Sequence, residues 1–104
     1  MLENSRKALL FVEGVDFESF INDEKTLYAI IRAIEVIGEA AKKVPLEFRE
    51  TYPQIPWREI AATRDKLIHE YFGINHRVIW NTVKEDLPGL IIELEKILRD
   101  FDVK

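Results

Sequence analysis

The sequence predicts an all-α protein whose main helices form an up-and-down four-helix bundle with short extra helical turns. Apolar residues recur at spacings of three and four along almost the whole chain, which is the pattern of amphipathic helices. Four long stretches of this kind are joined by short connections, as in an antiparallel bundle. The chain has 104 residues, a length that suits one domain over residues 1–104. With 47% apolar and 33% charged residues, it has the composition of a folded globular protein.

The first helix is predicted over residues 2–13. Gly14 follows as its C-terminal stop, because glycine readily adopts the left-handed conformation that ends helices. One face of this helix carries the apolar side chains Leu2, Leu9 and Val12. In the connector that follows, Asp16 is placed to cap a short helical turn.

The second helix has the most regular pattern in the chain, and we expect it to begin with Asn22 as its cap and to end at Pro45. A glycine inside it, Gly38, costs about 1 kcal/mol relative to alanine. Small residues allow a neighbouring helix or a ligand to come close. We expect the contacts made by such an approach to compensate for the cost of the glycine. The core-facing stripe consists of Leu27, Ile30, Ile31, Ile34, Ile37, Gly38 and Ala41.

The segment from Pro45 to Pro56 holds three of the four prolines. It predicts a short helical turn over residues 46–50 and then an extended loop. A third helix is expected over residues 57–72, ending at Gly73.

The fourth helix is expected to start near His76, with Asn75 as its cap. Pro88 lies inside its apolar pattern. Because an interior proline removes one backbone hydrogen bond, we expect the helix to be kinked or broken near this residue.

The composition excludes several classes of protein. The chain has no cysteine, which excludes a disulfide framework, a cysteine nucleophile and a thiolate metal site. No apolar run approaches the roughly 20 residues that span a bilayer, and no signal-peptide pattern opens the chain. We therefore expect a cytoplasmic protein without membrane contact.

The net charge of −4 argues at first against a nucleic-acid partner, because such proteins usually carry excess Lys and Arg. The acidic excess, however, lies in the two ends. Residues 1–31 carry a net charge of −3 and residues 78–104 carry −2, whereas residues 32–77 carry +1 and hold both histidines. An anionic ligand is therefore best tolerated in the centre, with local and modest binding.

One residue of the third helix departs from the pattern. Its stripe at spacings of three and four consists of Trp57, Ile60, Arg64, Leu67 and Tyr71. Arg64 thus stands where the pattern requires a leucine. Its side chain must reach the rim, pair with a carboxylate such as that of Glu39, or serve a site.

Other functional side chains follow Arg64 closely. Asp65 and His69 are four residues apart and share a helix face, so a carboxylate can orient an imidazole. Arg64 and His69 are five residues apart, which is about 140° around the axis. A local distortion near the end of the helix would bring them together. Alternatively, two copies of the helix paired across a two-fold axis would build a shared cleft.

This set of residues has a coherent chemistry. Histidine exchanges a proton near neutral pH, and arginine binds phosphate and stabilises charge that develops on it. Together they suffice for attack of a ribose 2′-hydroxyl on its neighbouring phosphodiester, so we expect no metal and no cofactor. Two histidines seven residues apart are weak evidence for zinc, and His76 is more simply explained as solvated.

The spacing of Arg64, His69 and Tyr71 resembles the Arg–four residues–His–any–Tyr motif of the HepT-like toxins in the HEPN superfamily. Other segments resemble this family in the same order over residues 16–98. They are Asp23–Thr26, Ile37–Lys42, Phe48–Glu50, Ile55–Ala61, Tyr71–Ile74 and Asp86–Pro88.

The resemblance implies an all-α homodimer that acts as a metal-independent endoribonuclease on RNA. It also implies a toxin–antitoxin system in which a minimal nucleotidyltransferase resembling MntA is the antitoxin. Arg64 and His69 match the catalytic pair, and Asp65 matches the polar residue that follows the arginine. Tyr71 matches the tyrosine to which the antitoxin attaches AMP, which adds negative charge and bulk where RNA phosphates would bind.

One feature departs from the family, and two other functions remain open. The first helix looks one or two turns shorter than usual, which bears on the dimer or on the partner surface. The chain can instead be a non-catalytic dimer that binds nucleotide or a nucleotidyltransferase. It can also be a structural bundle in which Arg64 merely pairs with Glu39.

Overall fold

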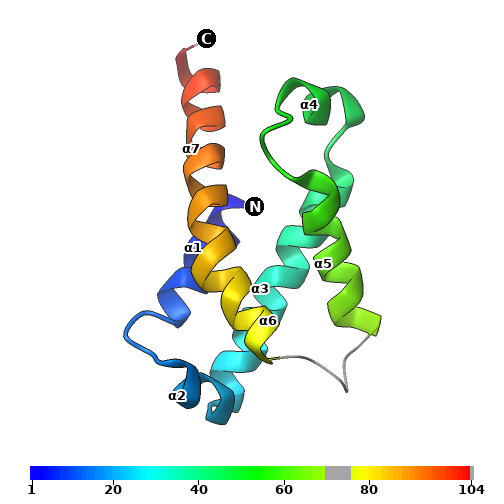
Figure 1. Ribbon diagram of the computed structural model, residues 1–104. Coiled ribbons are helices and arrows are strands. Elements are labelled where there is room, and N and C mark those ends of the chain that lie inside the picture. Colours follow the sequence, from blue (N-terminus) through cyan, green and yellow to red (C-terminus); the bar gives the residue numbers. More distant parts are fainter. Residues whose placement is uncertain (70–75, 104) are drawn as a thin grey trace.

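The computed structural model describes residues 1–69 and 76–103, with side chains for residues 1–66 and 76–100 (Figure 1). Throughout this part of the chain the regular elements are helices, which confirms the predicted all-α bundle. They are α1 (Leu2–Phe11), α2 (Phe17–Asn22), α3 (Glu24–Lys43), α4 (Leu46–Thr51), α5 (Trp57–His69), α6 (His76–Asn81), the π-helical turn η2 (Thr82–Asp86) and α7 (Leu87–Val103). No helix in the described ranges is long and apolar enough to cross a membrane.

Helix α3 lies in the middle of the arrangement (Figure 1). It packs on α5 along one side and on α1 along the other, and α1 in turn packs on α7. In the described part of the chain, α5 and α7 do not form a packed interface. The bundle is therefore closed around α3 and open between α5 and α7.

The short helix α2 and the start of α3 are set by two aspartates. Asp16 caps α2 as predicted, since its Oδ1 accepts a hydrogen bond of 2.7 Å from the backbone N–H of Ser19. The prediction that Asn22 caps the next helix is wrong. Asp23 caps α3 by accepting from the N–H of Thr26 at 3.2 Å. Asn22 is the last residue of α2, where its side-chain amide donates to a backbone carbonyl one turn earlier.

The apolar stripe predicted for the second helix is the centre of the core. Its residues from Ile30 to Ala41 are buried, and Leu27 is half-buried against them. Outside α3, the buried core residues are Ala8, Val12, Phe20, Ile55, Trp57, Ile79, Val83, Leu87, Leu90, Leu94 and Ile97. The first helix ends at Phe11, two residues before the predicted limit, and Gly14 adopts a φ of +73° in the turn that follows.

The disturbance predicted at Pro88 takes the form of a π-helical turn rather than a break. Helix continues from α6 through η2 into α7, and the backbone N–H of Leu87 bonds to the carbonyl of Thr82, five residues earlier. Proline has no N–H, and its ring presses against the carbonyl four residues before it. The wider π-helical turn directly before Pro88 provides room for the ring without ending the helix.

Candidate functional site

Arg64 lies where α5 crosses α3, and Gly38 makes that crossing possible. A Cβ atom built on Gly38 would overlap the Cβ of Arg64, and it would stand 2.8 Å from the Cγ of Arg64 and 3.2 Å from the carbonyl oxygen of Ile60. Only glycine leaves space for the stem of the arginine at this point. The expected close approach at Gly38 is thus confirmed, and the neighbour is the helix that carries Arg64.

The head of Arg64 joins a chain of alternating charges on α3 and α5. Its Nη1 donates a hydrogen bond of 3.0 Å to Oδ1 of Asp65, and its Nη2 lies 3.6 Å from Oε1 of Glu39. The same Oδ1 of Asp65 accepts a hydrogen bond from Nζ of Lys42 on α3. The predicted ion pair with Glu39 is therefore present, and Asp65 is a second partner.

The electrostatics of this cluster favour an ionised Asp65. The hydrogen bond from Lys42, and after it the one from Arg64, holds the pKa of the Asp65 carboxyl below its usual value of 3.8. The Asp65 side chain is 42% exposed, whereas that of Arg64 is 26% exposed. The cluster is thus open to solvent on the side of the carboxylate.

The donors of Arg64 are not all used. Its Nε is buried and has no hydrogen-bond partner among the described residues, and the 3.6 Å from Nη2 to Glu39 is longer than a hydrogen bond. An unpaired buried donor costs about 1–3 kcal/mol. A buried donor without a partner requires an explanation, and a role in binding or catalysis is one explanation.

The rest of the predicted motif is described only in part. His69 is the last residue of α5, and its side chain lies outside the described side chains; Tyr71 lies outside the described residues altogether. The expected pairing of Asp65 with His69 therefore stays a prediction. The backbone is α-helical from Arg64 to His69, so the local distortion considered above does not occur within that stretch.

Arg77, in the short helix α6, contacts α2. His76 begins α6 and is half-buried. The guanidinium of Arg77 lies 3.6 Å from the ring centroid of Phe17 in α2, in a cation–π contact. Arg77 thus supports the packing of α2 on α6.

Sequence reasoning did not identify Lys42 as part of this charged cluster. A signal was present, because Lys42 follows Gly38 by four residues and therefore lies on the same face of α3. The prediction of a close approach at Gly38 extends naturally to the residue one turn further along.

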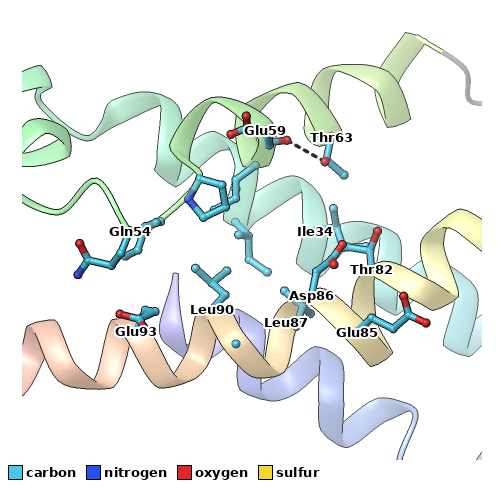
Figure 2. A pocket seen from close by; sticks show the side chains of 15 residues that line it. Ile34, Gln54, Glu59, Thr63, Thr82, Glu85, Asp86, Leu87, Leu90 and Glu93 are labelled. Carbon is cyan, nitrogen blue, oxygen red and sulfur yellow. Dashed lines mark hydrogen bonds between the residues drawn. The ribbon is translucent and has the colours of Figure 1, made fainter.

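A cavity of about 470 Å³ lies on another side of α5, in the opening toward η2 and α7 (Figure 2). The residues that line it include Ile34, Thr63 and Leu90, but neither Arg64 nor Asp65. Its charged members are all acidic, namely Glu59, Glu85, Asp86 and Glu93. The charge of this cavity opposes phosphate, and we place the candidate site at Arg64 instead.

Comparisons with known proteins agree with the resemblance found in the sequence. The model of the family described as "Ribonuclease HepT-like" matches residues 1–97. A protein of Thermococcus cleftensis named "Probable ribonuclease HepT" is 54% identical over 87 residues, which cover 84% of this chain and 79% of the relative. A protein of Methanocaldococcus jannaschii named "Putative RNase MJ0125" is 49% identical over 94 residues, covering 90% of this chain and 81% of the relative. No solved structure is significantly similar to the chain. The chain belongs to the HepT-like ribonuclease family.

Proposed function

We propose that this chain is an endoribonuclease whose site is built on Arg64 and His69. The observation that carries the proposal is the state of Arg64. Its stem is seated against Gly38, two carboxylates stand beside its head, and part of its donor capacity is unfilled. Membership of a family named for ribonucleases, and relatives with ribonuclease names, support the same reaction.

The proposed reaction is cleavage of RNA by its own 2′-hydroxyl. The 2′-oxygen loses its proton and attacks the adjacent phosphorus, and the bond from phosphorus to the 5′-oxygen breaks. The leaving 5′-oxygen takes up a proton, so the products are a 2′,3′-cyclic phosphate and a 5′-hydroxyl. His69 exchanges a proton in this sequence, and Arg64 stabilises the charge that builds on the non-bridging oxygens.

The geometry of α5 supports a homodimer. Because the helix is regular from Arg64 to His69, the two side chains start about 140° apart around its axis. A two-fold axis that pairs two copies of α5 supplies both groups to one cleft. Light scattering is expected to show a dimer at micromolar concentration. A protein that cleaves RNA while strictly monomeric would contradict the shared cleft.

The proposed regulation is that of a toxin–antitoxin system. A minimal nucleotidyltransferase antitoxin attaches AMP to Tyr71, two residues after His69, and the added phosphate repels RNA. We expect Tyr71→Phe to keep ribonuclease activity and to become insensitive to the transferase. Continued inhibition of this variant would exclude Tyr71 as the sole target.

The function is tested with purified protein and single-stranded RNA in the presence of EDTA. Wild-type protein is expected to leave 2′,3′-cyclic phosphate ends, while Arg64→Ala and His69→Ala each abolish cleavage. Arg58→Ala is the matched control, because it removes an exposed arginine from the same helix. Cleavage that survives both site substitutions contradicts the proposed site. Folded wild-type protein that leaves RNA intact but binds a cognate nucleotidyltransferase supports the non-catalytic alternative.

A further inference from the structure

Two cations from different helices converge on a single oxygen atom in the candidate site. Oδ1 of Asp65 accepts hydrogen bonds from Nζ of Lys42 on α3 and from Nη1 of Arg64 on α5, the latter at 3.0 Å. A non-bridging phosphate oxygen is also a negatively charged acceptor, and Lys and Arg are its usual partners in proteins. Donors that meet at a carboxylate oxygen therefore also meet where a phosphate oxygen can be bound.

We propose that Lys42 and Arg64 form a two-cation phosphate subsite whose place is held by the carboxylate of Asp65. The inference rests on the proposed ribonuclease function, because it assigns the position of one phosphate of the substrate. It adds Lys42 to the binding site and gives Asp65 the role of an internal competitor for that position.

The packing of the two helices brings these groups together. Gly38 allows α5 to approach α3 so closely that the stem of Arg64 lies against the α3 backbone. Lys42 comes one turn after Gly38 on the same face of α3, and Asp65 comes directly after Arg64. The subsite is therefore a consequence of the same helix crossing that seats the arginine.

The solvent exposure and the charge of the Asp65 carboxylate are suited to its replacement by a phosphate. The side chains of Lys42 and Asp65 are 41% and 42% exposed, so an incoming phosphate reaches both from solvent. The two hydrogen bonds that hold the Asp65 pKa below its usual value also keep this carboxylate charged, and a charged carboxylate screens the two cations from each other. A phosphate that displaces Asp65 takes over both functions.

The test measures binding without cleavage. Fluorescence anisotropy is recorded with a labelled 2′-O-methyl RNA oligonucleotide, in which the attacking hydroxyl is blocked, for wild type, Lys42→Ala, Lys42→Arg and Asp65→Asn. Lys43→Ala is the matched control, since Lys43 is the next residue on α3 and is also exposed. A circular dichroism melt establishes that each variant is folded.

Lys42→Ala is expected to weaken binding by about tenfold, as for the loss of one charge-assisted hydrogen bond. It should also reduce the slope of log K against log salt by about 0.7, the value for one phosphate contact with a single strand. Lys42→Arg should restore both quantities, and Asp65→Asn should bind more tightly than wild type. Lys43→Ala should change neither by a comparable amount. Equal affinity and salt slope for wild type and Lys42→Ala would overturn the subsite.

Titration with AMP distinguishes an RNA phosphodiester from a free nucleotide phosphate as the ligand. If the Lys42 effect is confined to the oligonucleotide, the subsite takes the RNA backbone, and if it is confined to AMP, the subsite takes a nucleotide. A wild type that binds neither probe overturns the subsite. A wild type that shows the Lys42 effect but never cleaves ordinary RNA supports the subsite and contradicts the ribonuclease function. A wild type that cleaves RNA, with no effect of Lys42→Ala on binding, contradicts the subsite and supports the ribonuclease function.

Discussion

Two sides of α5 differ in both spacing and charge. On one side α3 comes so close that Gly38 has no room for a side chain, and the charges of Lys42, Arg64 and Asp65 meet there. On the other side α5 stands apart from α7 and leaves a cavity of about 470 Å³, whose charged lining residues are all acidic (Figure 2). The size of a cavity alone therefore does not identify the candidate site. The sign of the charge and the convergence of donors point to the narrower side.

Substitutions of neighbouring residues on the two sides of α5 test where the chemistry lies. Arg64→Leu removes the cation but keeps apolar bulk, so we expect ribonuclease activity to fall at least about a hundredfold. The stability of the Arg64→Leu variant should stay close to that of wild type, because the substitution also removes a buried donor without a described partner. Activity and the free energy of unfolding are measured on the same preparation.

Thr63→Ala is the control for this substitution. Thr63 lines the cavity, and its hydroxyl donates a hydrogen bond of 2.8 Å to the backbone carbonyl of Glu59 (Figure 2). We expect its activity to match that of wild type. If Thr63→Ala lost as much activity as Arg64→Leu, the chemistry would have to be assigned to the cavity.

Two glycines test the difference in spacing. Gly38→Ala forces α3 and α5 apart, and overpacking of this kind costs about 1–3 kcal/mol, partly offset by the better helix propensity of alanine. Because Arg64 moves with α5, activity should fall as well. Gly89→Ala in α7 is the matched change, since nothing lies within 4 Å of a Cβ built there, and it should stabilise the protein by up to about 1 kcal/mol. Urea denaturation of both variants decides the matter, and equal stability would contradict the close crossing.

Much of the fold was predictable because local signals determine it. The stripe of α3 follows from apolar periodicity, and Asp16 follows from capping preference. The choice between Asn22 and Asp23 was not predictable from such preferences, since both residue types cap helices well. The choice depends on where α2 ends. Helix α2 is held in place by Phe20, whose ring centroid lies 5.1 Å from that of Trp80. Pro88 predicted a disturbance, but a proline is compatible with a kink, a break or a π-helical turn, so the form was not determined by the residue alone.

The candidate site was predictable where a residue broke a pattern. Arg64 interrupts an apolar stripe and Gly38 lies inside a helix, so the sequence pattern singles out both residues. Lys42 broke no pattern, because a lysine in the last turn of a helix is favoured by the helix dipole and needs no other explanation. The acidic cavity was equally hidden, since it exists only because α5 and α7 do not pack together.

The smallest expected effect concerns the dependence of stability on pH. Because Lys42 and Arg64 lower the pKa of Asp65 in the folded protein, the charged carboxylate stabilises the fold at every pH above its unfolded value of about 3.8. This stabilisation is lost as the pH falls through the lower pKa of the folded state. Thermal melts of wild type and Asp65→Asn should therefore differ slightly at neutral pH and converge in strong acid. The difference should be small because the carboxylate is exposed to solvent. A difference that grew on acidification would contradict the network of Lys42, Asp65 and Arg64 on the narrow side of α5.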